Sequence, residues 1–259
     1  MGIPGRRMLV AALVLSGLSA APLCASELRV YSGGAPQDTL KLLAPEFEKT
    51  TSHRVAFTFA VVGAIQQRLQ TGERADVVLL PAPLIDALEK AGKIRPDSRR
   101  RLARVGIAVV VRAGAPKPDV STTEAVRAAL MQARSITHAD PQATPGGRHI
   151  AGLLKQWDIT DTPQRRITPK SAISGGAELI ANGEVDIGLY LLSEVLTVKG
   201  VAVAGMLPPA LQNYIVYAGA VLGDSPAPEA AAEFIRFIAD PSREQQWKTT
   251  GFESIGQAK

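Results

Sequence analysis

The amino-acid sequence predicts an α/β protein with two doubly wound lobes joined by two crossing segments. First, short apolar runs, such as the strand-like segment 76–80, alternate with amphipathic segments of helical spacing. This alternation is typical of a parallel sheet that helices cover on both faces. Second, the same order occurs twice, with a proline-rich stretch at 113–118 between the repeats. Third, 259 residues are enough for two hydrophobic cores.

Residues 1–25 have the pattern of a secretory signal peptide. A pair of arginines precedes an apolar run at 8–20, and cleavage is expected after Ala25. The run is too short to span a membrane as a helix. Its removal takes away Arg6 and Arg7 and no acidic residue, so the formal net charge falls from +5 to +3. It also removes the only cysteine, Cys24. We therefore expect an exported, periplasmic chain without disulfide or thiol chemistry.

The first repeat begins with an apolar strand that runs into two glycines. Leu40, Leu43 and Phe47 then follow at helical spacing with charges between them, which predicts an amphipathic helix over 39–49. Pro36 is favoured in the first turn of that helix, where its missing N–H costs nothing. The remaining segments complete a β-α-β-α-β-α order. The expected strands are 28–31, 54–60 and 76–80, and the expected helices are 39–49, 63–70 and 84–91.

The second repeat follows a long apolar strand expected at 105–112. We place the first crossing between the lobes at its proline-rich exit and the return crossing near Pro208-Pro209. Lobe 1 is then 26–111 plus 214–259, and lobe 2 is 112–213. The expected helices of the second unit are 123–132, 150–156 and 176–182, its strands are 135–138, 166–168 and 186–191, two further strands lie within 201–221, and closing helices cover 230–239 and 241–250.

The charge pattern does not indicate a nucleic-acid partner. The net charge is small, aromatic residues make up 5% of the chain, and the basic residues are not interleaved with them. The densest basic stretch is interpreted as a solvated loop, with a docking patch for an acidic partner as the alternative. It contains Lys90, Lys93, Arg95, Arg99, Arg100, Arg101 and Arg104.

Four glycine-containing loops are the candidate binding elements. They lie at 32–35, 61–63, 144–147 and 171–176, each directly before a helix. The N-terminus of a helix presents free N–H groups and the positive end of the helix dipole, which favours an anion. In an open α/β sheet such loops meet at the carboxyl ends of the strands. The sequence therefore predicts a site for a small anion.

No constellation typical of catalysis accompanies these loops. The three histidines, at 53, 138 and 149, are scattered and lack the spacing of metal ligands. Nucleophile elbows, phosphate loops and dinucleotide fingerprints are absent from the sequence. We expect a monomeric binding protein, not an enzyme, with neither metal nor organic cofactor.

The chain resembles the periplasmic molybdate-binding proteins of ABC importers, which belong to the type II periplasmic binding protein superfamily. The most specific segments are Gly72–Leu79 and Leu88–Ile94. Support comes from Ala139-Asp140-Pro141 leading to Pro145-Gly146-Gly147, from Gly183–Gly188 and from 234–252. The resemblance covers essentially the whole mature chain. It implies two lobes that close on a small oxyanion and a protein that delivers it to a permease in the inner membrane.

The contact residues of that family are only partly present. Ala35 and Val62 stand where the family has serine hydroxyls, and Leu191 stands at its tyrosine position with Tyr190 one place early. Backbone donors of the family fall near Gly146 and Ile173, and Ser171 is a further hydroxyl nearby. The expected ligand-binding residues are Ser32, Gly33, Gly34, Ala35, Val62, Gly63, Gly146, Gly147, Arg148, Ile173, Ser174 and Tyr190.

The ligand class stays open between a molybdate-like or tungstate-like oxyanion and a small carboxylate. Lost hydroxyl donors disfavour the oxyanion, and an apolar surface at Val62 and Ile173 suits a carboxylate with a hydrocarbon part. Two other functions remain as alternatives. One is an enzyme on the same fold, such as a small-acid dehydratase, which needs an acid and a base in the cleft. The other is a sensor that reports ligand occupancy to a membrane receptor.

Overall fold

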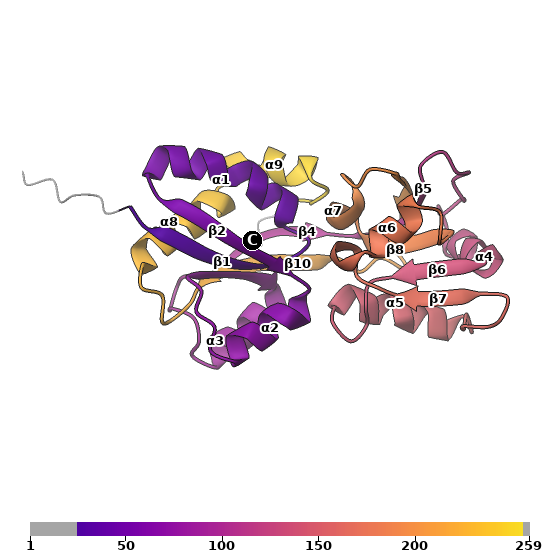
Figure 1. Cartoon of the computed structure of the whole chain (residues 1–259), viewed down its shortest axis with the longest axis horizontal. Helices are drawn as coiled ribbons and strands as arrows, with labels where there is room; N and C mark the ends of the chain where they lie inside the picture. The colour runs from indigo at the N-terminus through magenta and orange to yellow at the C-terminus, as the bar shows by residue number, and fades with distance from the viewer. Residues whose placement is uncertain (1–24, 256–259) are drawn as a thin grey trace, which may run out of the picture.

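The computed structural model describes residues 25–255, which form two lobes lying end to end along the long axis of the molecule (Figure 1). Each lobe contains one five-stranded sheet, with strand orders β2-β1-β3-β10-β4 and β7-β6-β8-β5-β9. The predicted α/β class with two lobes is confirmed. The predicted signal peptide, including Cys24, lies outside the described residues except for Ala25.

The first lobe contains both ends of the described chain (Figure 1). β10 lies between β3 and β4 and is antiparallel to both, whereas β1 is parallel to β2 and β3. This order brings a late segment of the sequence into the middle of a sheet built from early ones. The elements are β1 (Glu27–Gly33), α1 (Gln37–Thr51), β2 (Arg54–Ala60), α2 (Val62–Gln70), β3 (Val77–Pro81), α3 (Ala82–Lys90), β4 (Arg100–Val105), β10 (Ile215–Val221), α8 (Pro228–Ala239) and α9 (Glu244–Thr249).

The second lobe is continuous in sequence. β6 is parallel to β7 and β8, and β5 is antiparallel to β8 and β9. A short 3-10 turn, Ala172–Ser174, precedes its third helix. The elements are β5 (Ile107–Arg112), α4 (Thr123–Gln132), β6 (Ser135–His138), α5 (Pro145–Gln156), β7 (Arg166–Pro169), α6 (Gly176–Ala181), β8 (Ile187–Leu191), α7 (Leu192–Val195) and β9 (Val201–Met206).

Two expectations about the crossing region need correction. The apolar run expected as one strand is divided at Gly106, because Val105 pairs with Ile215 in the first sheet and Ile107 pairs with Leu191 in the second. The first crossing is therefore at Gly106, not at 111/112, and β5 belongs to lobe 2. The basic stretch is also not wholly a solvated loop. Its last part forms the edge strand β4, in which Ala103 and Val105 are buried, Arg100 and Arg101 are exposed and Arg104 is half-buried.

The side chain of Gln212 links the two crossing segments by hydrogen bonds. Its Oε1 accepts a hydrogen bond from the N–H of Ile107 at 2.7 Å, and its Nε2 donates to the carbonyl groups of Ile107 at 3.1 Å and Leu207 at 3.2 Å. The Leu207 N–H donates in turn to the Ile107 carbonyl at 2.9 Å. The outgoing and returning chains thus lie side by side where the lobes meet.

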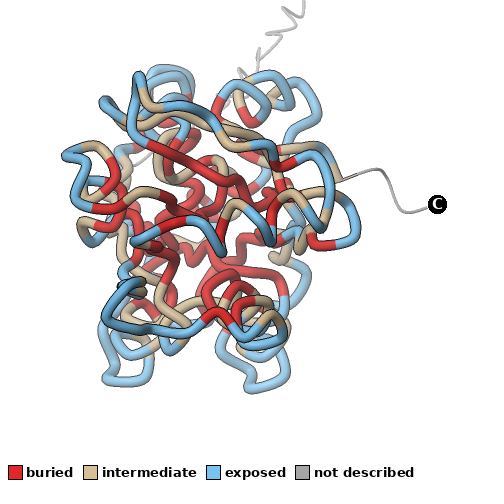
Figure 2. Tube along the Cα trace, turned by 90° about the vertical axis from the view of Figure 1, so that its right-hand side faces the viewer, coloured by how far each residue is buried: buried red, intermediate tan, exposed pale blue. Residues whose placement is uncertain are grey.

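The largest cluster of buried apolar side chains continues from lobe 1 into lobe 2, and a smaller cluster lies within each lobe. Figure 2, an end-on view, shows the buried segments at the centre with exposed segments around them. In lobe 1 Phe47 and Phe234 are fully buried and pack edge to face, with ring centroids 5.0 Å apart. Asp76 has a structural role. Its carboxylate accepts from the Arg29 N–H at 2.8 Å and from the Ser225 hydroxyl at 2.6 Å. Within 25–255 no helix has the length and apolar character needed to cross a bilayer.

Candidate functional site

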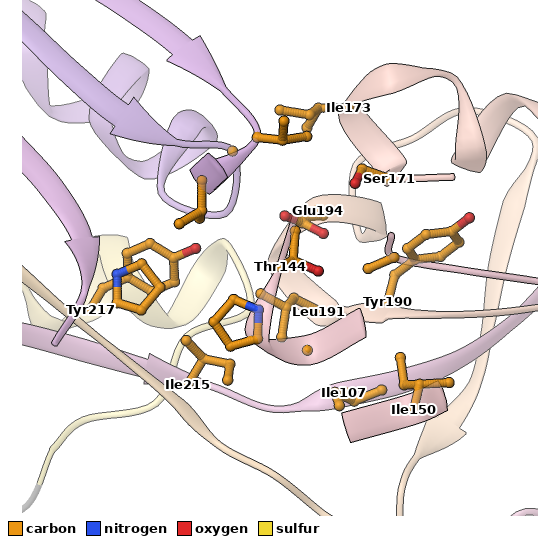
Figure 3. Close-up of a pocket in the computed structure, with 17 residues that line it drawn as sticks. Ile107, Thr144, Ile150, Ser171, Ile173, Tyr190, Leu191, Glu194, Ile215 and Tyr217 are labelled. Carbon is orange, nitrogen blue, oxygen red and sulfur yellow. The ribbon is translucent and has the colours of Figure 1, made fainter. Parts of the chain in front are cut away.

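A cavity of about 20 Å³ lies between the lobes, at the ends of strands from both sheets (Figure 3). Ile215 and Tyr217 reach it from β10 of lobe 1, and Leu191 and Glu194 reach it from β8 and α7 of lobe 2. Such a volume holds about one water-sized group. The remaining lining residues are Gly34, Val61, Val62, Pro81, Ile107, Ala139, Thr144, Pro145, Gly146, Ile150, Ser171, Ile173 and Tyr190.

Three helices begin at this cavity. α1 starts just after Gly34, α2 starts at Val62, and α5 starts with Pro145 and Gly146. The first N–H groups of a helix have no acceptor within it, and they carry the positive end of the helix dipole. Thr144 caps α5 by accepting a hydrogen bond from the Gly147 N–H at 3.0 Å. The residues that line the cavity include no lysine, arginine or histidine, so these helix ends are its source of positive potential.

Three polar side chains line the same cavity without a hydrogen-bond partner among the described residues. The Ser171 hydroxyl is buried and unpaired, Tyr217 is 2% exposed, and Glu194 lies across from Tyr217 (Figure 3). Burial raises the pKa of Glu194 to about 7. Burial, and then the nearby charge of Glu194, raise the pKa of Tyr217 well above its usual range. Tyr217 is thus a neutral hydroxyl, and Glu194 changes its charge near neutral pH.

The rest of the lining is apolar. Isoleucines at 107, 150, 173 and 215 surround the polar groups, together with Val61, Val62 and Leu191. An ionised carboxylate or oxyanion needs donors on every exposed oxygen once water is excluded. Apolar walls favour a ligand that has a hydrocarbon part beside its charged part. The cavity thus combines an anion-binding end with an apolar surface.

The structure brings together five of the expected ligand-binding residues at the cavity: Gly34, Val62, Gly146, Ile173 and Tyr190. Tyr190 lines the cavity, but its hydroxyl points away from Glu194 in Figure 3. That hydroxyl lies 2.7 Å from the Thr137 hydroxyl and donates to the Lys170 carbonyl at 2.9 Å. Tyr190 therefore does not take the place of the tyrosine of the molybdate-binding family, because its hydroxyl is hydrogen-bonded in the interior of lobe 2.

Seven expected residues lie beside the cavity without lining it. The Ser32 hydroxyl donates to the Gly33 carbonyl, and Ala35 packs in the core of lobe 1. Gly63 donates its N–H to the Ala143 carbonyl across the lobes at 3.2 Å. Gly147 is required for packing, since a Cβ there would lie 2.3 Å from the Ala139 carbonyl oxygen. Gly33 leaves room for Tyr217, and Arg148 and Ser174 are exposed.

Sequence reasoning missed Glu194 and Tyr217. The sequence pattern assigns the stretch around Tyr217 only to the return crossing. Tyr217 is also more than 180 residues away in sequence from Gly34, which lines the same cavity. Glu194 follows the apolar strand that ends at Leu191, and an acidic residue three places after a buried strand was the available signal. Only the pairing of β10 with β3 shows that these two residues share one cavity.

The fold has two α/β lobes with a small, partly polar cavity between them. In sequence, residues 28–253 match the family described as bacterial extracellular solute-binding protein. The chain belongs to this family. The predicted resemblance to periplasmic molybdate-binding proteins is confirmed by its relatives.

Two relatives and one solved structure are informative. An aconitate isomerase from Pseudomonas sp is 30% identical over 92% of this chain and 93% of that protein. The molybdate-binding protein ModA of Azotobacter vinelandii is 26% identical over 70% of each chain. The solved periplasmic molybdate-binding protein of Azotobacter vinelandii superposes with a TM-score of 0.73 at 22% identity, over 87% of this chain and 98% of that one, which shows the fold.

Proposed function

We propose that this protein captures a small carboxylic acid anion between its lobes in the periplasm and delivers it to an ABC permease. The observation that carries the proposal is the meeting of three helix N-termini at a cavity with mostly apolar walls. The helix ends favour the carboxylate, and the isoleucines favour its hydrocarbon part. Membership in an extracellular solute-binding family supports the expected location and transport role.

A fully deprotonated metal oxyanion fits this cavity less well. Val62 supplies no hydroxyl to it, and Ala35 is buried in the core of lobe 1. Each missing hydrogen bond to a buried charge costs about 1.5–3 kcal/mol. Ser171 and Tyr217 offer two hydroxyl donors, but the other walls are mostly apolar and leave some oxygens of a tetrahedral dianion without a donor. We therefore expect weak molybdate binding.

Binding requires the lobes to separate and close again. The cavity of about 20 Å³ is smaller than any of these ligands. The crossing segments at Gly106 and 207–214 are the only covalent links between the lobes within residues 25–255. A rotation about these segments admits the ligand, and the N–H of Gly63 meets the Ala143 carbonyl when the lobes are closed.

A thermal-shift screen tests the proposal. A true ligand at about 100 times its dissociation constant adds about 2.7 kcal/mol of stability, which raises the melting temperature by about 5–10 °C in a chain of this length. Citrate, malate, succinate, molybdate, tungstate and sulfate form the panel. A shift with a carboxylate that exceeds the shifts with the oxyanions supports the proposal. A large molybdate shift without a carboxylate shift contradicts it.

A second candidate is isomerisation of a small unsaturated acid. It is supported by the Pseudomonas aconitate isomerase, which aligns with nearly the whole chain, and by Glu194, since a carboxyl with a pKa of about 7 can both take and give a proton near neutral pH. Incubation of the protein with cis-aconitate, followed by NMR, tests it. Formation of the trans isomer by the wild type but not by Glu194→Gln supports catalysis. Binding without turnover favours solute capture.

A further inference from the structure

We infer that Glu194 selects ligands that donate a hydrogen bond, such as hydroxy acids or acids that keep one protonated oxygen, against anions of similar size that carry only acceptors. This inference rests on the proposed binding of a small anion in the cavity between the lobes. It adds the residue that distinguishes one anion from another.

The position of Glu194 is the first support. α7 begins directly at the end of β8 and carries Glu194 into the cavity, where the carboxyl group lies near Thr144 and across from Tyr217 (Figure 3). Among the described residues, no donor is hydrogen-bonded to this carboxyl group, and no cation lines the cavity to neutralise it. A carboxyl group with unused acceptor oxygens in a closed site favours a donor on the ligand.

The other polar groups of the cavity are mainly donors. The N-termini of α1, α2 and α5 present backbone N–H groups, of which those of Gly63 and Gly147 are hydrogen-bonded within the protein, and the Ser171 and Tyr217 hydroxyls can donate as well. An anionic oxygen is stabilised there. Glu194 is the one lining side chain that can act as a strong acceptor, so the ligand atom beside it is favoured if it carries a hydrogen.

The titratable groups that face Glu194 from its neighbours leave this preference in place. Tyr217 approaches from β10, whereas the hydroxyl of Tyr190 on β8 points away from Glu194. Both tyrosines keep their protons because burial raises their pKa values. Burial also raises the pKa of Glu194 to about 7. Below that pH the protonated carboxyl group can itself donate to an anion. Acceptor-only anions should thus bind better as the pH falls.

Calorimetric titration with matched ligand pairs tests the inference. Malate differs from succinate, and citrate from tricarballylate, by one hydroxyl group at equal charge. We expect the wild type to bind the hydroxyl-bearing member about tenfold more tightly at about pH 8. Glu194→Leu, which removes every acceptor, should abolish the preference. Glu194→Gln, which keeps the shape and removes the charge, should tighten succinate binding about tenfold.

A matched control is Glu178→Gln. Glu178 lies exposed on α6 and does not line the cavity. Its replacement by glutamine removes one negative charge, as Glu194→Gln does. Its ligand preference should equal that of the wild type. Sulfate adds a pH test, because it carries no proton in this range. Wild-type affinity for sulfate should rise about tenfold from about pH 8.5 to about pH 6, and that of Glu194→Gln should stay constant.

Three outcomes would overturn the inference. The first is an equal preference within each pair for the wild type and Glu194→Leu, with binding intact. The second is a sulfate affinity that does not change with pH in the wild type. The third is the absence of binding for all of these anions, in which case the proposed function fails and the inference fails with it. The first two outcomes leave the proposed capture of an anion unaffected.

Discussion

Replacement of Gly34 by alanine should hold the lobes apart. A Cβ at Gly34 would lie 2.8 Å from both Cδ1 and Cγ2 of Ile173, and 3.4 Å from its Cγ1. Rotation about χ2 moves Cδ1 away, but Cγ2 is fixed by the stiff χ1 of a β-branched residue. The two lobes must therefore separate by several tenths of an ångström at this contact. The open form does not feel the added methyl group, because Gly34 and Ile173 belong to different lobes.

The size of the effect follows from the cost of overpacking. An added methyl group in a filled contact costs about 1–3 kcal/mol, and here the closed form alone carries that cost. Ligand affinity should fall about 5- to 150-fold. The double variant Gly34→Ala/Ile173→Ala removes all three contacted atoms and should recover most of the loss. Gly152→Ala is the control, because Gly152 does not line the cavity and its Cβ would meet no atom within 4 Å.

Calorimetry with the acid that binds the wild type most tightly measures these affinities. Small-angle X-ray scattering of the ligand-saturated variants measures how far the lobes close. An affinity of Gly34→Ala within about twofold of the wild type, less than 0.5 kcal/mol, would refute the reasoning. A double variant as weak as the single one would show that Gly34 acts by some other means than its contact with Ile173.

Three further predictions concern stability. Burial raises the pKa of Glu194 from 4.5 to about 7, so the folded protein holds a proton that the unfolded chain releases. The free energy of unfolding should fall by about 1–3 kcal/mol as the pH rises from 4.5 to 7, and urea titrations should show this dependence lost in Glu194→Gln. Gln212→Leu leaves the Ile107 N–H without its acceptor and should lower stability by about 1–3 kcal/mol, as measured by denaturant titration. Gly147→Ala places a methyl group 2.3 Å from the Ala139 carbonyl oxygen, so its melting temperature should fall even when ligand affinity is retained.

Much of the fold was predictable because local periodicity and packing agree. Leu40, Leu43 and Phe47 recur at helical spacing, and all three are buried in α1. The division at Gly106 was not predictable from the pattern, since apolar residues continue on both sides of it and only their partners in two different sheets distinguish them. β4 was not predicted because its arginines interrupt the apolar pattern of a strand. An edge strand tolerates such charged side chains on its open side.

The candidate site was predictable where it is made of backbone. Gly34 and Gly146 mark loops before helices, and both line the cavity. Side-chain roles were harder to predict. Tyr190 resembled a ligand contact, but its hydroxyl bonds within lobe 2. Tyr217 carries no local signal, because its role depends on the position of β10 between two strands formed far earlier in the chain.

The position of β10 has a consequence for the order in which the chain folds. The second sheet has all of its strands once residue 206 is available, whereas the first sheet lacks an interior strand until residues 215–221 arrive. Pairing β10 with β3 must close a loop of more than a hundred residues, and such long-range contacts form slowly. Folding of lobe 2 shortens that loop, because the two ends of the lobe 2 segment, near Gly106 and Leu207, are then held close to each other. In pulsed hydrogen exchange, amides of β6 and β8 should gain protection before those of β3 and β10.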